Sequence, residues 1–279
     1  MKTLITALST PYKEGKIDCY SYEKLLDYQI KNGVDMLLAV GTTAEAQLLS
    51  ACEKKLLIKL AKGIASSVPV FVGIEGRSTR DAVNDAVLAE SLGADGLLIA
   101  PPAFVKCTPQ GYLQHVLQIR KVVSIPLMLY NAPSRCNYVL DETVVEELSA
   151  SVTYLKDAGS DLGYTKNLAS KLSLLCGNDI LLTEFLQRGA CGVVSVVSNV
   201  APQLTREILE GNLTAKCGDT TNIEVFTELA RLSMLEVSPI AIKYMLYKKG
   251  IFDSYEMRLP LTPASVKTQE DITKFWSKI

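Results

Sequence analysis

Short apolar runs alternate with longer amphipathic stretches along the first two-thirds of the chain. The runs are rich in Val, Leu and Ile, and such near-continuous apolar composition is typical of strands that are buried on both faces of a parallel sheet. Turn residues and amphipathic segments separate one run from the next. Eight strands are predicted, at residues 3–8, 36–40, 70–73, 96–100, 126–130, 152–156, 174–176 and 192–197.

Most of the segments between these runs have apolar residues at the spacing that one face of a helix requires. Several of them begin at a Ser, Thr or Asp residue, which are preferred N-caps. Helices are predicted at residues 22–31, 52–65, 78–92, 108–122 and 141–149. Eight strands that alternate with helices favour an α/β fold of the (β/α)8 TIM-barrel type. An open doubly wound sheet is the alternative, but the chain has no Gly-rich first turn.

The strand pattern ends near residue 215, and three further helices are predicted at residues 222–234, 238–249 and 270–278. The sequence therefore predicts a (β/α)8 catalytic domain over residues 1–215 and a small C-terminal helical domain over residues 216–279. The apolar run at the N-terminus is interrupted by Pro11, too early for a signal peptide or a membrane helix. A cytoplasmic location is expected.

Composition and charge exclude several kinds of partner. The net charge is −1 and the pI is near 6, so no strong field favours nucleic acid or an anionic membrane. The seven cysteines are odd in number and never form a CxxC pair, which fits reduced thiols. The one histidine, His115, falls inside a predicted helix, and no cluster of metal-ligand residues or nucleotide-binding motif is present. We expect neither a metal nor a cofactor.

The chemistry of a TIM barrel lies at the carboxyl ends of its strands. The fifth predicted strand ends at Tyr130 and the sixth ends at Lys156, while Thr42 and Thr43 follow the second and Arg135 follows the fifth. An amine beside a phenol suggests Schiff-base chemistry, and hydroxyl and guanidinium groups suit a small keto acid. Taken singly, these could be a solvated lysine, a core tyrosine, helix-capping threonines and a surface arginine. Those simpler explanations would all have to hold at once.

Several motifs resemble the dihydrodipicolinate synthase family, more fully 4-hydroxy-tetrahydrodipicolinate synthase, within the superfamily of pyruvate-dependent aldolases and lyases that includes N-acetylneuraminate lyase. The resemblance runs from Leu4 to Pro263. The Pro-Ser-Arg after the tyrosine and the late Arg-Leu-Pro-Leu-Thr-Pro favour the synthase over its relatives. The motifs are Gly-Thr-Thr-x-Glu at 41–45, Leu-Tyr-Asn-Ala-Pro-Ser-Arg at 129–135, Lys-Asp at 156–157, Gly-Asn-Asp at 177–179, Gly-Val-Val-Ser-Val at 192–196 and Arg-Leu-Pro-Leu-Thr-Pro at 258–263.

The resemblance implies an enzyme that condenses pyruvate with L-aspartate 4-semialdehyde, in the pathway to diaminopimelate and lysine. Lys156 would form the Schiff base with pyruvate, which requires a partly neutral amine, and burial in the barrel mouth favours the neutral form. Tyr130 would carry protons, and Thr42 would hydrogen-bond its phenol. The family usually forms homotetramers built from tight dimers.

Substrate binding is likewise assigned by the resemblance. Thr43 and nearby backbone N–H groups would hold the pyruvate carboxylate, and Arg135 offers a planar fork to the carboxylate of the second substrate. Gly177 and Val194 would contribute backbone groups.

Two residues depart from the family pattern. The tyrosine that completes a proton relay across the dimer interface is Phe104 here, and Ala44 replaces a glycine in the loop of Thr42 and Thr43. Water, Tyr112 or Tyr138 would then have to replace the missing phenol. Two alternatives therefore stay open: a related pyruvate-dependent 2-keto acid aldolase or lyase with another aldehyde, and a non-catalytic homologue that binds a keto acid.

Regulation by lysine is predicted to be weak or absent. In members that lysine inhibits, the effector site uses neutral or acidic groups, whereas an incoming lysine would here meet the like charges of Lys54 and Arg77. A lysine titration of the activity would test this expectation. The corresponding positions are Ala46, Ala51, Lys54, Arg77, Asp81 and Ala103.

Overall fold

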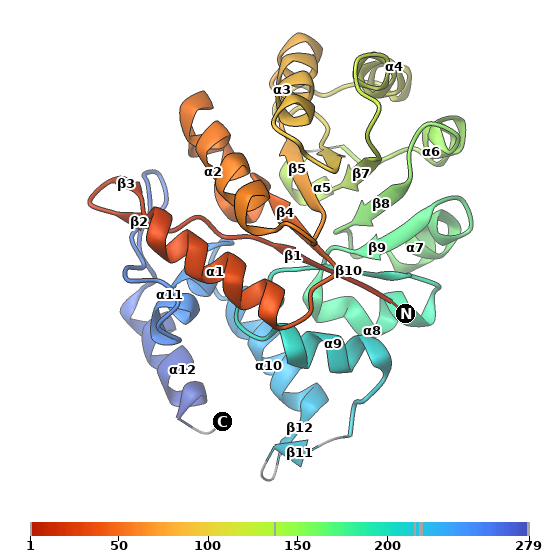
Figure 1. Cartoon of the computed structure of the whole chain (residues 1–279). Coiled ribbons are helices and arrows are strands. Elements are labelled where there is room, and N and C mark those ends of the chain that lie inside the picture. The colour runs from red at the N-terminus through yellow and green to blue at the C-terminus, as the bar shows by residue number, and fades with distance from the viewer. Residues whose placement is uncertain (1, 137, 215, 218–219, 278–279) are drawn as a thin grey trace.

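The chain folds around a closed barrel of eight parallel strands, as the apolar runs predict (Figure 1). The computed structural model describes residues 2–136, 138–214, 216–217 and 220–277. All eight predicted strands are confirmed, and their ends differ from the prediction by at most two residues. They are β1 Thr3–Ala7, β4 Met36–Ala39, β5 Val70–Ile74, β6 Gly96–Ile99, β7 Leu127–Asn131, β8 Tyr154–Asp157, β9 Ser173–Cys176 and β10 Gly192–Ser195.

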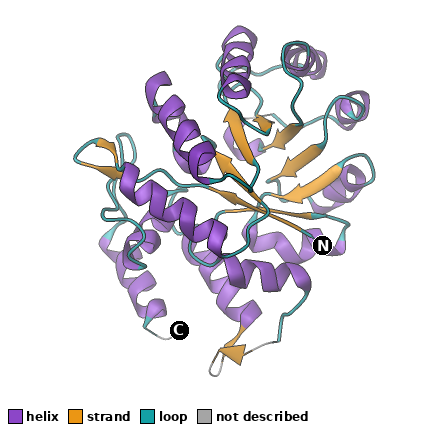
Figure 2. Ribbon diagram, viewed as in Figure 1, coloured by secondary structure: helices purple, strands orange, loops and turns teal. Residues whose placement is uncertain are grey.

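Helices surround the barrel and continue beyond its last strand (Figure 2). The predicted helices are all present, and four more that the sequence did not predict are α5, α7, α8 and α9. No helix among the described residues is long and apolar enough to cross a membrane. The helices are α1 Cys19–Lys31, α2 Ala51–Ile64, α3 Thr79–Ser91, α4 Pro109–Arg120, α5 Pro133–Cys136, α6 Glu142–Leu148, α7 Leu162–Ala169, α8 Leu182–Gln187, α9 Pro202–Glu210, α10 Asn222–Ser233, α11 Ile240–Lys248 and α12 Val266–Trp276.

Two short antiparallel pairs accompany the barrel. One joins β2 (Tyr12–Lys13) to β3 (Lys16–Ile17), and the other joins β11 (Lys216–Cys217) to β12 (Thr220–Thr221). The expectation that strands end near residue 215 was therefore wrong. Two-residue strands are too short to show a hydrophobic period, so the sequence pattern gave no sign of them.

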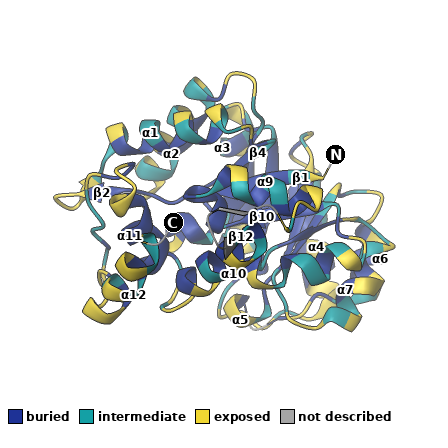
Figure 3. Ribbon diagram, turned by 90° about the horizontal axis from the view of Figure 1, so that it is seen from below, coloured by how far each residue is buried: buried dark blue, intermediate teal, exposed yellow. Residues whose placement is uncertain are grey.

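Alternation along each strand divides the core into two layers. On β7, Leu127 and Leu129 belong to the layer between strands and helices, whereas Met128 and Tyr130 belong to the cluster that fills the barrel interior. Successive side chains of a strand point to opposite faces, which explains this division. Figure 3 shows the strands buried beneath helices whose outer faces are exposed. Because both faces are covered, the strands read as continuous apolar runs.

A buried ion pair joins the barrel to the C-terminal helices. Lys243 on α11 donates from Nζ to Oε1 of Glu45 at 2.8 Å, and both side chains are fully buried. The Lys243 amine also lies 4.1 Å from the centre of the Tyr12 ring. The loop after β4 is thus fixed from the C-terminal side. The division of the chain at residue 215 stays a prediction.

Cysteine thiols are unpaired in the part of the chain whose side chains are described. The side chain of Cys217 lies outside that part. The free cysteines are Cys19, Cys52, Cys107, Cys136, Cys176 and Cys191.

Candidate active site

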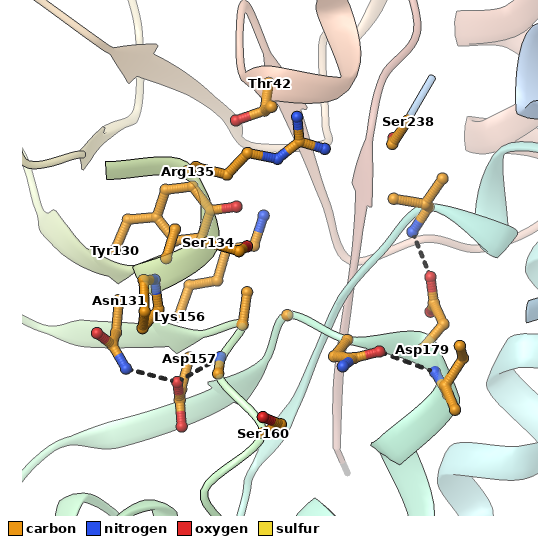
Figure 4. Close-up of a pocket in the computed structure, with 18 of the residues that line it drawn as sticks. Thr42, Tyr130, Asn131, Ser134, Arg135, Lys156, Asp157, Ser160, Asp179 and Ser238 are labelled. Carbon is orange, nitrogen blue, oxygen red and sulfur yellow. Dashed lines mark hydrogen bonds between the residues drawn. The ribbon is translucent and has the colours of Figure 1, made fainter. Parts of the chain in front are cut away.

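Lys156 and Tyr130 meet in the barrel interior. Leu155 packs into the outer layer, so alternation along β8 turns the next side chain, Lys156, into the barrel. Tyr130 on β7 is its register partner, and the Lys156 Nζ lies 4.4 Å from the centre of the phenol ring. Figure 4 shows the two side chains beside each other. Each belongs to a residue that is only 6% exposed. The amine and phenol that the sequence predicted to be neighbours are therefore brought together.

Gly177, which follows β9, leaves space for the lysine. A Cβ atom at this position would lie 2.9 Å from Cε of Lys156 and 3.0 Å from the carbonyl oxygen of Asp157. Contacts this short require a shift of the neighbours, and one of these is backbone. The position therefore requires glycine if the lysine is to keep its place.

A buried hydrogen-bond network holds the ends of β7 and β8. Asp157 is fully buried and accepts hydrogen bonds from Asn131 Nδ2 at 2.8 Å, from Gly159 N–H at 2.9 Å and from the hydroxyl of Thr165 at 2.8 Å. Asn131 in turn accepts from the N–H of Leu140 at 3.2 Å. A buried carboxylate with several donors is well satisfied. This network fixes the carboxyl ends of β7 and β8 directly next to Lys156.

A cavity of about 610 Å³ opens above the lysine at the carboxyl ends of the strands. Six of the seven predicted site residues line this cavity, and Val194 does not. Val194 is buried in the barrel interior, and Val196 lines the cavity instead. The chain turns out of the strand after Ser195, so the second residue beyond Val194 reaches the cavity wall. The predicted residues on the cavity wall are Thr42, Thr43, Tyr130, Arg135, Lys156 and Gly177.

A carboxylate that the sequence analysis did not single out lies beside Thr42. The Thr42 hydroxyl donates to Oε1 of Glu75 at 3.1 Å, rather than to the phenol of Tyr130, and Gln47 Nε2 donates to Oε2 of Glu75 at 2.9 Å. A carboxylate is the stronger acceptor, which explains the choice. Glu75 directly follows β5. Its position at the carboxyl end of a strand is the signal that could have identified it from sequence.

The turn that presents the threonines begins with a strained residue. Val40 has a φ of 55°, which is unusual for a β-branched side chain and costs on the order of 1–3 kcal/mol. A Cβ atom on Gly73 of β5 would lie only 2.4 Å from the carbonyl oxygen of Val40. The absence of a side chain at Gly73 therefore permits the turn. Ala44 needs no glycine-like torsion, because Val40 and Glu45 are the left-handed residues of this loop.

Arg135 on α5 lines the main cavity and a smaller hollow of about 190 Å³. The two spaces also share Thr42 and Ser238, and Figure 4 shows the guanidinium between these residues. The hollow is lined in addition by Glu75 and Gln47. A planar cation at this junction is suited to bind a carboxylate.

Asp179 closes the opposite wall. Its Oδ2 accepts a hydrogen bond from the N–H group of Val196 at 2.8 Å (Figure 4) and a second from the N–H group of Val197 at 3.1 Å. Burial raises the pKa of this carboxyl, although the two N–H groups stabilise its anion. Asp179 therefore anchors the loop after β10 to the segment after β9.

Phe104 lies away from the cavity. Its side chain is fully exposed, and its φ of 63° places it in the left-handed region. Tyr112 and Tyr138, the suggested substitutes for the relay tyrosine, do not line the cavity, and Tyr112 donates its hydroxyl to the carbonyl of Ile99 at 3.3 Å. Tyr164 does line it, but its hydroxyl donates to the carbonyl of Leu140.

Metal ligation has no candidate in the described part of the chain, where no group of three or more His, Cys, Asp or Glu residues could hold an ion. His115 is buried on α4, with Nδ1 3.0 Å from the hydroxyl of Thr79. Burial lowers the pKa of its ring, so the neutral form is favoured.

Known proteins resemble the chain over its whole length. The model of the Dihydrodipicolinate synthetase family matches residues 1–279. The 4-hydroxy-tetrahydrodipicolinate synthase of Rickettsia bellii (strain OSU 85-389) is 37% identical over 279 residues, which cover 97% of this chain and 95% of that relative. The solved structure of the chloride-inhibited dihydrodipicolinate synthase from Acinetobacter baumannii, complexed with pyruvate, is 31% identical, with a TM-score of 0.91 over 99% of this chain and 98% of that chain. A solved structure of a monomeric dihydrodipicolinate synthase variant is 30% identical, with a TM-score of 0.90 over 100% of this chain and 96% of that chain.

Proposed function

The chain belongs to the dihydrodipicolinate synthetase family, and we propose that it catalyses the condensation of pyruvate with L-aspartate 4-semialdehyde, the reaction of a 4-hydroxy-tetrahydrodipicolinate synthase. The observation that carries this proposal is the buried Lys156 amine 4.4 Å from the centre of the Tyr130 ring, at the floor of the cavity. The synthase reaction is one step of lysine and diaminopimelate biosynthesis.

Lys156 is the proposed nucleophile. Its neutral amine attacks the keto carbon of pyruvate, and loss of water gives an iminium. The iminium withdraws electrons from the neighbouring methyl group, which then loses a proton to form an enamine. The enamine carbon attacks the aldehyde of the second substrate and forms the new carbon–carbon bond. The protein supplies the electron sink, so the proposed reaction needs no cofactor.

Proton transfer is assigned to Tyr130 and Thr42. The phenol lies beside the amine and can exchange protons with the substrate atoms bonded to it. Thr42 shares the cavity wall and can accept a hydrogen bond from the phenol while it donates to Glu75.

Substrate carboxylates are assigned to opposite parts of the rim. Thr43 lines the cavity from the turn after β4 and is proposed to hold the carboxylate of pyruvate together with backbone N–H groups of that turn. Arg135, at the junction with the smaller hollow, is proposed to bind the carboxylate of the semialdehyde. Gly177 contributes space and backbone groups beside the lysine. Val194 is proposed to act only through the interior packing beneath the cavity.

Membership of the family also leads us to propose an oligomeric state and a cellular location for the protein. A homotetramer of tight dimers is the expected state, and the exposed Phe104 and Val105 are suited to lie in the dimer interface. A cytoplasmic location fits the free thiols of the described cysteines.

Reductive trapping tests the proposed chemistry. The purified protein is incubated with pyruvate and borohydride, and the modified peptide is mapped by mass spectrometry. We expect a reduced pyruvyl adduct on Lys156, and no adduct in K156A. A folded wild-type protein without adduct would contradict the Schiff-base proposal and favour the non-catalytic homologue. With the adduct established, turnover of aspartate semialdehyde in competition with other aldehydes separates the synthase from a related aldolase.

A further inference from the structure

Glu75 lies behind Thr42, on the side away from the substrate cavity. It directly follows β5, is half-buried, and lines the smaller hollow without lining the main cavity. Its two carboxylate oxygens accept from Thr42 at 3.1 Å and from Gln47 at 2.9 Å. Building on the proposed function, we infer that Glu75 is a positioning residue of the proton path, which orients the Thr42 hydroxyl and takes up the proton that the phenol of Tyr130 releases.

The direction of the hydrogen bond carries the first step of this inference. A hydroxyl group has one hydrogen and two lone pairs. Because the hydrogen of Thr42 points to Glu75, only lone pairs of its oxygen are left for the cavity side. The phenol of Tyr130, on the same cavity wall, can then act only as the donor toward Thr42.

The proton balance follows from this orientation. The phenol hydrogen of Tyr130 moves to Oγ1 of Thr42 while the hydrogen already on Thr42 moves to Oε1 of Glu75. The resulting phenolate accepts a proton from the methyl carbon of the pyruvate iminium, and the C–H electron pair forms the enamine double bond. The reverse shift along the same path returns a proton to the substrate. No electrons are gained or lost.

The other aromatic residues considered for the relay do not take the place of Glu75, and Tyr138 does not line the cavity. Phe104 has no hydroxyl, and the hydroxyls of Tyr112 and Tyr164 already donate to the backbone carbonyls of Ile99 and Leu140. Within the described residues, Glu75 is the carboxylate bonded to Thr42, and it comes from the same chain. The path therefore needs no phenol from a second subunit.

The smaller hollow permits a direct test by chemical rescue. The hollow has a volume of about 190 Å³ and is lined by Glu75. A small carboxylate can therefore enter it and occupy the space that a truncated Glu75 side chain leaves. Exchange of the pyruvate methyl hydrogens for deuterium, followed by NMR in D₂O, measures proton transfer without the second substrate. Borohydride trapping on Lys156 measures Schiff-base formation separately.

For E75Q, which keeps the size and an acceptor oxygen, we expect the adduct at wild-type yield and a methyl exchange that is about 10- to 100-fold slower, since general acid–base groups contribute on this scale. Exchange in E75A should be similarly slow and should rise when acetate or formate is added. T42V should be slow and should not respond to acetate. The matched control is E147Q, an exposed carboxylate on α6 that lines neither space, and it should match the wild type.

Wild-type exchange in E75Q would overturn the inference. So would slow exchange in E75A that acetate does not raise, or loss of the adduct together with exchange in folded E75Q, because Glu75 would then act only on the architecture of the site. A wild-type protein that forms no adduct overturns the proposed function and this inference with it. Failure of Glu75 alone leaves the adduct on wild-type Lys156 intact.

Discussion

At the scale of single residues, the reactive amine depends on small neighbours. Lys156 is turned into the barrel by strand alternation, and Gly177 provides the volume that its Cε occupies. Strand-end position predicted the lysine, the tyrosine and the threonines from sequence. It did not predict that Thr42 would donate to Glu75, because the partner of a hydroxyl depends on which loops meet in space. Weak inhibition by lysine also stays a prediction at this scale.

Replacement of Gly177 by alanine should impair the site directly. The added methyl group would lie 2.9 Å from Lys156 Cε and 3.0 Å from a backbone oxygen, so the lysine must move. We expect the yield of pyruvyl adduct to fall at least about 10-fold and the free energy of unfolding to drop by about 1–3 kcal/mol, the usual cost of overpacking. Trapping and urea denaturation measure the two effects.

The matched control for that change is G63A on α2, where an added Cβ meets nothing within 4 Å. This variant should keep the wild-type adduct and be as stable as the wild type or slightly more so, since alanine favours a helix. An unchanged adduct in G177A would show that the lysine does not depend on this space.

At the scale of elements, long apolar runs were predictable and short turns were not. All eight strands and eight of the described helices follow from period and composition, whereas the six- to nine-residue helices α7, α8 and α9 were missed. The four-residue α5 and the 3₁₀ turn η1 (Thr42–Ala44) are too short to show a period, although they carry Arg135 and Thr42. The buried pair between Glu45 and Lys243 also escaped prediction, because the two residues are 198 positions apart. Such contacts depend on tertiary packing.

Loss of one member of the buried pair should destabilise the protein strongly. K243M leaves the Glu45 carboxylate in an apolar interior without its cation, and such losses cost about 3–5 kcal/mol. The double variant E45L/K243M removes both charges and should recover most of the stability. Urea denaturation near pH 7 measures both. A single variant as stable as the wild type would contradict the expected role of the pair.

Lys243 should also make the free energy of unfolding depend on pH in the alkaline range. Burial lowers the pKa of Lys243 to about 8, against an ordinary value of 10.5, although Glu45 opposes the shift. Between these values the unfolded chain binds more protons than the folded protein, so stability should rise with pH from about 8 to 10. The rise should be on the order of 2 kcal/mol relative to E45L/K243M, which lacks the group. Parallel curves for the two proteins would contradict this.

At the scale of the whole molecule, the barrel is covered on its outer face, yet several large apolar side chains are exposed, among them two neighbours in one loop. Phe104 and Val105 project from the segment between β6 and α4, and Phe104 is held in the left-handed region. Large exposed apolar groups often mark an interface. The proposed tight dimer would bury them.

A charge in this loop should weaken the assembly. V105D would place a carboxylate in the proposed interface, where burial without a partner costs several kcal/mol. We expect sedimentation velocity to show a shift toward monomers at micromolar concentration. The control variant V266D, which changes a more exposed valine on α12, should leave the assembly unchanged. If the wild type is a monomer, the proposed interface does not exist. If V105D assembles like the wild type, the interface lies elsewhere.

The ion pair between Glu45 and Lys243 also limits how this protein can be recombined with its relatives. A chimera that joined the first 215 residues to an unrelated C-terminal segment would keep the carboxylate and lose its cation. The damage would reach the turn of Thr42 and Thr43, because Glu45 ends that turn. The barrel and its C-terminal helices should therefore be inherited together or exchanged together.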